Sequence, residues 1–437
     1  LSQVIDYLLD FHFDDEDTAY LASLTGNDGR PLFTPEFLKY LQDLELDCDI
    51  HAIPEGTVVF PHEPLVRVTG PLLQCQILES ALLNMINFQT LIATKAARVC
   101  LAAEGDPVME FGLRRAQGID GGVSASRAAF VGGCAGTSNV LAGKLYDIPV
   151  KGTHAHSWVM VFDDELQAFR GYAEAMPNNC IFLVDTYDTL QGVRHAVTVG
   201  NELRQAGHEM VGIRIDSGDL AYLGIAARKI LDEAGFDDKI IVGSSDLDEH
   251  VIDSIKDQHA PISSWGVGTR LATAFDDPSL GGVYKLTAVK GEDGRWEYKI
   301  KLSEQLMKVT TPGVLQVRRY KRNGDYSADA IYDLQLGIDE PCVIVDPMNP
   351  TRLKRIPAGV SHEDLLVPVF EKGSLAYQAP CCREARDRCL KNLACLHPAI
   401  KRLLNPHEYP AGLEMRLHEL RTDLIRDARA AMGKETL

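Results

Sequence analysis

The chain has 437 residues, of which 45% are apolar, and a formal net charge of −18. This length and apolar content allow two domains with substantial cores. A surface this acidic repels polyanions, which argues against a binder of nucleic acid or of an anionic membrane. No run of 18 apolar residues occurs, so the sequence predicts no membrane span. The ten cysteines are scattered through a long chain, which indicates a reducing, cytoplasmic location.

The first part of the chain combines a helical start with short strands. Residues 1–17 are amphipathic and lack the basic start of a signal peptide, so they predict a helix. Residues 45–75 contain short apolar runs broken by Pro and Gly, which are typical of strands. We assign residues 1–105 to the N-terminal part of a flanking α+β domain.

The middle of the chain alternates short apolar runs with amphipathic segments. The runs lie at residues 107–111, 148–152, 180–185, 210–216, 239–245, 263–269 and 281–289. Strands and helices that alternate at intervals of about thirty residues imply a parallel sheet of right-handed βαβ units. About seven strands fit either an open doubly wound sheet or a barrel.

The last part of the chain returns to hairpins and helices. Residues 283–335 predict antiparallel hairpins, with turns at 290–295 and 321–326. Residues 381–404 and 412–432 have helical patterns. We therefore expect the flanking domain to be built from both chain ends.

Four cysteines lie close together near the C-terminus. They are Cys381, Cys382, Cys389 and Cys395. Zinc sites usually show C-x2-C spacing, which this group lacks. Thiols that pack between helices are the favoured interpretation, and a structural zinc site is the alternative.

Polar residues follow nearly every apolar run of the middle part at once. They include Arg114, Arg115, Thr153, His154, His156, Thr186, Tyr187, Asp188, Arg214, Asp216, Asp219, Asp246, Thr269 and Arg270. Ligands of parallel α/β proteins bind at the carboxyl ends of the strands. These residues therefore predict one shared site.

The residue types at these ends favour an anionic ligand. Arg114 and Arg214 offer planar forks that suit a carboxylate or a phosphate, although for either alone a surface ion pair is an equally good interpretation. Gly266 and Gly268 allow backbone amides to approach an anion, and Thr269 adds a hydroxyl group. Arginines, a glycine-rich turn and carboxylates together favour a phosphorylated sugar with magnesium.

The carboxylates at these ends have different interpretations. Asp216 and Asp219 suit ribose hydroxyls or a hydrated Mg²⁺ ion, although Asp219 alone is better explained as a helix N-cap. Asp185 closes an apolar run, so we expect it to be half-buried and to need a partner. His156 is the candidate partner, because a carboxylate can orient an imidazole and raise its basicity.

His154 and His156 are one residue apart, a spacing that also occurs in barrel hydrolases that bind zinc. The later strand ends supply no further histidine ligand, and His195 and His208 lie in helical segments. A zinc site needs more ligands than this pair provides, so a nucleophilic or packing histidine remains.

Seven motifs occur in order along the chain. They are EFGLRRAQGIDGG (110–122), GTSNVLAG (136–143), GTHAHSW (152–158), DTYDT (185–189), RIDSGD (214–219), GVGTR (266–270) and GGVYKL (281–286). Together with NPHEYPAGL (405–413) they resemble the nicotinate phosphoribosyltransferase family. We expect an incomplete α/β barrel of about seven parallel strands over residues 106–300, with residues 301–437 as the C-terminal part of the flanking domain.

The resemblance implies an activity and its co-substrates. The family joins nicotinate to 5-phosphoribosyl 1-diphosphate, giving nicotinate mononucleotide and diphosphate, in NAD salvage. ATP hydrolysis is coupled to this reaction through a phosphorylated histidine, which corresponds to His156, with His154 as a neighbour. The family is dimeric, with active sites at the subunit boundary, so the resemblance also implies a homodimer.

The resemblance also implies substrate contacts. Thr153 and Arg214 correspond to nicotinate contacts, and Thr269 corresponds to a contact with phosphoribosyl diphosphate. Phe111 and Arg114 match the pair that sandwiches the pyridine ring in the related nicotinamide enzyme.

Ser138 stands where that nicotinamide enzyme has an aspartate that favours a carboxamide. A serine brings no negative charge to repel a carboxylate. Ser138 therefore favours nicotinate as the substrate.

The expected chemistry assigns a role to each group. The pyridine nitrogen attacks C1 of the ribose as diphosphate leaves, so the ring must be aligned and the leaving group neutralised. Asp216 holds the ribose, and Asp185 steadies one nitrogen of His156 while the other accepts phosphate. Mg²⁺ is held mainly by diphosphate and water, with Asp219 as the candidate protein ligand.

One departure from the family pattern concerns the N-terminus. Family members begin with a segment whose Tyr stacks on the nicotinate of the neighbouring subunit, and this sequence starts after that point. Either the segment is unrecorded or the chain is shortened, and a shortened chain favours one alternative, an inactive relative that acts as a binding protein. The alternative enzymes are the nicotinamide-type and quinolinate-type phosphoribosyltransferases, which share the fold.

Overall fold

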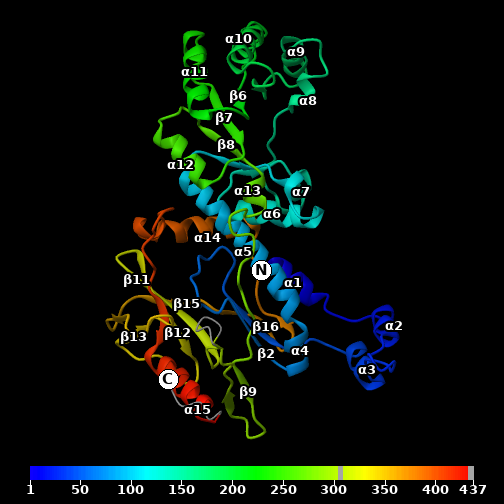
Figure 1. The fold of residues 1–437 in the computed structure, drawn as a ribbon, viewed down its shortest axis with the longest axis vertical. Coiled ribbons are helices and arrows are strands. Elements are labelled where there is room, and N and C mark those ends of the chain that lie inside the picture. Colours follow the sequence, from blue (N-terminus) through cyan, green and yellow to red (C-terminus); the bar gives the residue numbers. More distant parts are fainter. Residues whose placement is uncertain (304–308, 432–437) are drawn as a thin grey trace.

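A parallel sheet covered by helices lies at one end of the molecule, and antiparallel sheets lie at the other, in a computed structural model that describes residues 1–303 and 309–431 (Figure 1). The parallel strands are, in sheet order, β4 (Gly136–Thr137), β3 (Val108–Glu110), β8 (Ser264–Val267), β7 (Ile240–Ser245), β6 (Gly212–Ile215) and β5 (Ile181–Leu183). All neighbouring pairs run parallel. Every residue of β8 is buried, as in sheets covered on both faces.

Helices alternate with these strands, as the sequence pattern predicts. They are α6 (Ile119–Val131), α7 (Val140–Tyr146), α8 (His156–Val159), α9 (Glu165–Ala175), α10 (Thr189–Gln205), α11 (Leu220–Glu233), α12 (Glu249–Asp257) and α13 (Thr269–Ala272). Asp188, Asp219 and Asp248 cap α10, α11 and α12 with their carboxylates. Each cap starts its helix directly after a strand end, so the polar loops are short and lie on one edge of the sheet.

The expected fold class is confirmed, and the count of strands needs a correction. Two of the expected runs do not form full strands of this sheet. Residues 148–152 contribute an isolated parallel bridge between Thr137 and Val150. The 281–289 run lies outside the sheet: Val283 and Leu286 are exposed, and Ala288 and Val289 pair with residues 297–298 in a separate antiparallel hairpin. The barrel is therefore incomplete, with six strands and one bridge.

The flanking part joins both ends of the chain. One sheet has the order β17 (Ser374–Leu375), β16 (Val367–Glu371), β1 (Asp49–Ala52) and β2 (Val66–Thr69). A second sheet has the order β14 (Leu353–Ile356), β13 (Cys342–Val345), β18 (Ala411–Glu414), β12 (Asp325–Asp333), β11 (Leu315–Arg322) and β15 (His362–Asp364). A small hairpin pairs β9 (Ala288–Lys290) with β10 (Trp296–Tyr298), and both expected hairpin turns are present.

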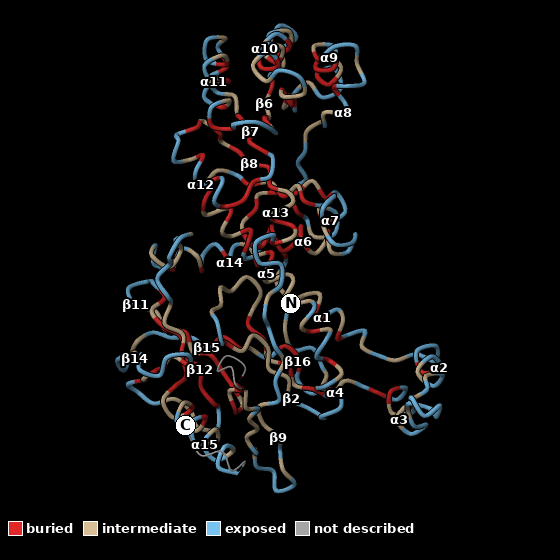
Figure 2. The backbone as a smooth tube through the Cα atoms, viewed as in Figure 1, coloured by how far each residue is buried: buried red, intermediate tan, exposed pale blue. Residues whose placement is uncertain are grey.

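The remaining helices lie outside the parallel sheet (Figure 1). They are α1 (Ser2–Leu9), α2 (Asp15–Ser23), α3 (Pro35–Gln42), α4 (Leu72–Ile77), α5 (Glu79–Ala102), α14 (Cys382–Ala394) and α15 (Met415–Ala431). Helices α2 and α3 project to one side of the molecule (Figure 1). The long helix α5 lies between the two parts of the molecule, and buried backbone concentrates along the parallel strands and α6 (Figures 1 and 2). None of the helices that the structure describes is long and apolar enough to cross a membrane.

Two of the four C-terminal cysteines, Cys382 and Cys389, are buried as expected, whereas Cys381 is exposed and Cys395 is half-buried. Cys382 lies in an apolar cluster with Phe130 and Ala385, and Cys389 is also buried. All ten thiols are free. No group of three or more metal-ligating side chains comes together within residues 1–303 and 309–431, so these residues offer no zinc site.

Candidate active site

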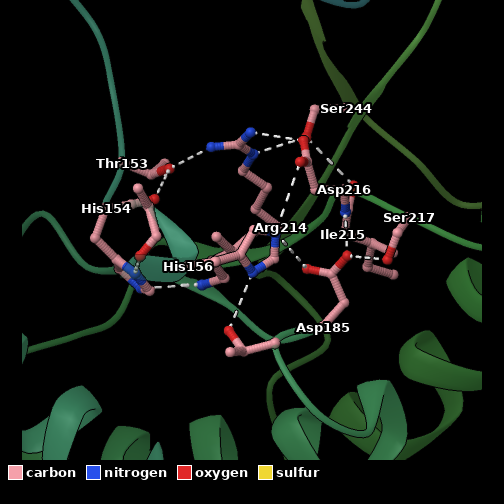
Figure 3. Close-up of polar contacts among 12 residues, drawn as sticks. Thr153, His154, His156, Asp185, Arg214, Ile215, Asp216, Ser217 and Ser244 are labelled. Carbon is pink, nitrogen blue, oxygen red and sulfur yellow. Dashed lines mark hydrogen bonds and ion pairs between the residues drawn. The ribbon is translucent and has the colours of Figure 1, made fainter. Parts of the chain in front are cut away.

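Side chains at or just after the ends of β6 and β7, and after the bridge at Val150, meet around Arg214, near the end of β6 (Figure 3). Its Nη1 donates to Thr153 Oγ1 (2.9 Å) and its Nη2 donates to Asp216 Oδ1 (2.6 Å). Its Nε donates to Ser244 Oγ in β7 (2.7 Å), and the Ser244 hydroxyl donates in turn to Asp216 Oδ1. The guanidinium carbon lies 5.8 Å from the centre of the Phe111 ring. The cation is thus fixed beside an aromatic face, with part of its N–H groups left for a ligand.

His156 begins α8 and lies beside two carboxylates. Its Nε2 is 3.9 Å from Asp185 Oδ1 and 3.7 Å from Asp216 Oδ2. Its Nδ1 is 3.1 Å from Thr186 Oγ1. The imidazole is 38% exposed, so a ligand can reach it while the carboxylates hold it from behind.

Asp185 is the most enclosed group of this cluster, since its side chain is only 1% exposed. Its Oδ2 accepts from the Asp216 backbone N–H (3.0 Å) and from Ser217 Oγ (2.5 Å). Its Oδ1, which faces His156, has no hydrogen-bond partner among the residues described. This oxygen is therefore free to accept a hydrogen bond from the side of His156, whose Nε2 lies 3.9 Å away.

The charge of Asp216 is stabilised by its neighbours. Burial alone would raise its pKa, but the Arg214 cation and the bonds from Ser244 and Arg214 lower it below the ordinary value. Asp216 is therefore a carboxylate at neutral pH. It can accept hydrogen bonds from sugar hydroxyls with Oδ2.

His154 has a different environment from His156. Its Nε2 accepts from the Leu183 backbone N–H (3.1 Å), and its ring packs edge-on against Tyr172. Burial lowers the pKa of His154 to about 4, so it is neutral at physiological pH. The structure thus separates the two histidines into one that packs and one that faces the cluster.

The glycine-rich segment at the end of β8 and in the turn after it packs against Phe111. A Cβ atom on Gly266 would lie 2.7 Å from the Phe111 ring and 3.2 Å from Ser244 Cβ, so only glycine fits there. A Cβ atom on Gly268 would lie 3.2 Å from the carbonyl oxygen of Phe111. Thr269 then begins α13. These glycines therefore determine where the Phe111 ring lies, and with it the site beside Phe111 and Arg214, here called the ring site.

Some expected site residues lie apart from this cluster. Arg114 is exposed in a 3-10 turn, Leu113–Arg115, and makes no hydrogen bond or ion pair with any described residue. Ser138 is half-buried, and its backbone N–H donates to the Glu110 carbonyl oxygen (3.0 Å). Asp219 caps α11 through the Tyr222 N–H (3.0 Å), the role that its place before the helix suggests.

A hollow of about 460 Å³ adjoins the cluster. The starts of α11 and α12 and the loops after β6 and β7 line it, with Gly218 next to Ser217 and Ser245 next to Ser244. Ser245 has φ 136°, a strained conformation for a residue with a side chain. Asp219, Asp246 and Asp248 also line the hollow, and Asp219 and Asp248 occupy the first N–H groups of α11 and α12, so a phosphate group here would need a cation beside it.

The sequence pattern missed several groups of the site. Ser244 and Ser217 bond the predicted residues directly, and both stand within polar strand ends that the sequence shows. Thr186, which contacts His156, was among the residues expected at this site. Glu110 was missed for a different reason. It reads as the end of an apolar run, and only the fold reveals its buried partners.

Comparisons with known proteins agree with this arrangement. The model of the nicotinate phosphoribosyltransferase family matches residues 107–308. Models of that family's N-terminal and C-terminal domains match residues 1–87 and 316–421. Nicotinate phosphoribosyltransferase of Bacillus subtilis is 43% identical, over 97% of this chain and 87% of the relative.

Solved structures give the same result. The crystal structure of human nicotinic acid phosphoribosyltransferase superposes with a TM-score of 0.81 and 30% identity, over 97% of this chain and 91% of that one. A nicotinate-nucleotide pyrophosphorylase from Pyrococcus furiosus superposes with a TM-score of 0.64 and 27% identity, over 82% and 84%. The chain belongs to the nicotinate phosphoribosyltransferase family.

Proposed function

We propose that this chain joins nicotinate to 5-phosphoribosyl 1-diphosphate, giving nicotinate mononucleotide and diphosphate in NAD salvage. The family supports the reaction. The observation that carries the assignment to this site is the Arg214 guanidinium, fixed by Thr153, Asp216 and Ser244 beside the Phe111 ring. A fixed cation next to an aromatic face is what a pyridine carboxylate requires.

The transfer step uses the groups around that cation. The pyridine nitrogen forms a bond to C1 of the ribose while the bond from C1 to the diphosphate oxygen breaks, through a state that resembles an oxocarbenium ion. Phe111 aligns the ring, and Asp216 accepts from the ribose hydroxyls. Gly266 at the end of β8 and Gly268 in the turn after it pack against Phe111, and Thr269 follows them. Arg114 and Ser138, which lie apart from the cluster in this structure, are proposed as substrate contacts from the family resemblance alone.

Magnesium fits this site as a partner of the diphosphate. The carboxylates available to it are Asp216, Asp185 and Asp219, and the unpartnered Asp185 oxygen is buried behind His156. Mg²⁺ would be held mainly by diphosphate and water, with Asp219 as the candidate protein ligand, and would neutralise the leaving group.

ATP coupling is proposed to pass through His156. The γ-phosphoryl group of ATP moves to an imidazole nitrogen, ADP leaves, and hydrolysis later returns phosphate. The carboxylates of Asp185 and Asp216 face Nε2, so they stabilise a proton there while the other nitrogen reacts. The added phosphate changes which ligands the site prefers, and this difference supplies the coupling.

Replacing His156 by Ala tests this role. We expect His156→Ala to lose stimulation by ATP and to keep a weak ATP-independent synthesis of the mononucleotide, measured with and without ATP. His208→Ala is the control, because His208 bonds Asn178 outside the cluster (3.0 Å). Full stimulation by ATP in His156→Ala would contradict the role.

Three further proposals rest on the resemblance and the sequence pattern. They are a homodimer with shared active sites, a cytoplasmic location, and domain boundaries at residues 1–105, 106–300 and 301–437. Sedimentation of the purified chain tests the first. A monomer at working concentrations would contradict it.

The activity is tested by substrate-dependent release of diphosphate. We expect release with nicotinate and phosphoribosyl diphosphate, and much weaker release with nicotinamide. A preference for nicotinamide would indicate the nicotinamide-type enzyme, and release with decarboxylation of quinolinate would indicate the quinolinate-type enzyme. No release with any of them would indicate a binding protein.

A further inference from the structure

A buried carboxylate stands one residue before Phe111. Glu110 ends β3, and it is 1% exposed. No lysine, arginine or histidine of the described chain forms an ion pair with it. A buried carboxylate without a cation is costly unless hydrogen bonds hold it, so its partners explain why the fold tolerates it.

Three segments donate hydrogen bonds to this one carboxylate. Its Oε2 accepts from Ser126 Oγ in α6 (2.8 Å) and from Thr137 Oγ1 in β4 (2.6 Å). Its Oε1 accepts from the Gly112 backbone N–H in the turn after β3. Glu110 therefore ties a helix, a neighbouring strand and its own turn together.

The donors lie next to the residues that shape the ring site. The Gly112 backbone directly follows Phe111, and a Cβ atom on Gly112 would lie 3.0 Å from Glu110 Oε1 and 2.8 Å from the Gly268 carbonyl oxygen. This close fit leaves the turn little freedom. On the β4 side of Glu110, the Ser138 backbone N–H donates to the Glu110 carbonyl oxygen (3.0 Å).

We propose that Glu110 is a positioning residue for the pyridine ring. Through the turn after β3 it holds Phe111 beside Arg214. Through Thr137 it holds Ser138, the residue expected to select a carboxylate over a carboxamide. The inference rests on the proposed function, because it requires nicotinate to bind against Phe111. Glu110 itself does not touch the substrate.

The test is Glu110→Gln, which keeps the side-chain shape but replaces one acceptor oxygen by an NH₂ group. That NH₂ group would face the hydroxyl or N–H groups that now donate to Glu110. We expect the KM for nicotinate to rise on the order of tenfold, while the KM for phosphoribosyl diphosphate stays within about twofold. A loss that is only structural would not separate the two KM values in this way.

Asp333→Asn is the matched control. Asp333 is fully buried in β12 without an ion pair among the described residues, and it accepts from Tyr298 Oη (2.7 Å) and the Val314 N–H (2.8 Å). We expect both Glu110→Gln and Asp333→Asn to lower the melting temperature, because each disturbs a buried hydrogen-bonded carboxylate. Asp333→Asn should leave the KM values for nicotinate and for phosphoribosyl diphosphate unchanged. Equal changes in the KM for nicotinate in both variants would overturn the proposal.

A second variant keeps the test decisive if Glu110→Gln fails to fold. Thr137→Val removes one donor and keeps the side-chain shape, so we expect a smaller rise in the KM for nicotinate; an unchanged KM would overturn the inference. Phe111→Ala separates the two proposals. If it raises the KM for nicotinate while the Glu110 and Thr137 variants do not, only the positioning role is wrong. If Phe111→Ala leaves the KM for nicotinate unchanged, the proposal that nicotinate binds against Phe111 is wrong.

Discussion

At the scale of single residues, Arg214 is held in place before any substrate arrives. Thr153, Asp216 and Ser244 accept its N–H groups from different sides. A ligand carboxylate therefore meets a cation whose plane is already set, and little side-chain entropy is lost on binding. Because Asp216 shares this network, the same bonds also keep its carboxylate charged.

Arg214→Lys tests this preorganisation. A lysine keeps the charge but cannot donate to three acceptors in one plane, so we expect the KM for nicotinate to rise roughly 10- to 100-fold, equivalent to about 1.5–3 kcal/mol. Steady-state kinetics measures the change. Arg170→Lys is the control, because Arg170 pairs with Glu202 at the surface (2.6 Å). Similar kinetics for Arg214→Lys and the wild type would contradict a fixed fork.

At the scale of elements, the pairing of β3 with β8 builds the ring site. The Phe111 backbone N–H donates to the Val267 carbonyl oxygen (2.8 Å), which places the Phe111 side chain over Gly266. Because Gly266 has no side chain, the Phe111 ring can occupy the space above it. The geometry of one residue in β8 therefore decides where a side chain of the neighbouring strand can lie.

Gly266→Ala would push the Phe111 ring from this place. The new Cβ atom would meet the ring at 2.7 Å, so we expect a higher KM for nicotinate and a loss of about 1–3 kcal/mol in the free energy of unfolding. Gly121→Ala is the control, because a Cβ atom there meets nothing within 4 Å. We expect that helical change to leave the kinetics alone. An unchanged KM in Gly266→Ala would show that the ring position does not matter.

The same elements show what sequence patterns can predict. Buried apolar runs followed by polar residues located β5, β6, β7 and β8, because a strand covered on both faces has few polar positions. The 281–289 run is also partly apolar, but Val283 and Leu286 are exposed and Tyr284 packs against the flanking part, and only tertiary contacts decide such burial. Ser244 and Glu110 were missed because their roles depend on partners about 16 to 30 residues away along the chain.

At the scale of the whole molecule, both chain ends fold against each other beside the catalytic sheet. β1 pairs with β16, which lies more than 300 residues later, so the flanking part forms only when both ends are present. The free energy of unfolding is therefore a property of the entire chain. Its dependence on pH reports buried titrating groups such as His154.

His154→Gln tests this dependence. Burial lowers the folded pKa of His154 to about 4, whereas the unfolded value is about 6.5. Its contribution to stability is full above about pH 6.5 and is lost as the pH falls toward 4, by at most about 3 kcal/mol before solvent screening. Urea unfolding at several pH values gives the free energy of unfolding as a function of pH. Between pH 6.5 and 4 this free energy should fall less for His154→Gln than for the wild type. Parallel curves would mean that His154 titrates normally in the folded chain.

The most direct test of the account is a crystal structure with nicotinate bound. We predict that the nicotinate carboxylate lies within hydrogen-bond distance of Arg214 and that its ring packs against Phe111, with the ring nitrogen facing the side of Asp216. A nicotinate carboxylate bound elsewhere, with Arg214 still bonded only to Thr153, Asp216 and Ser244, would contradict the account.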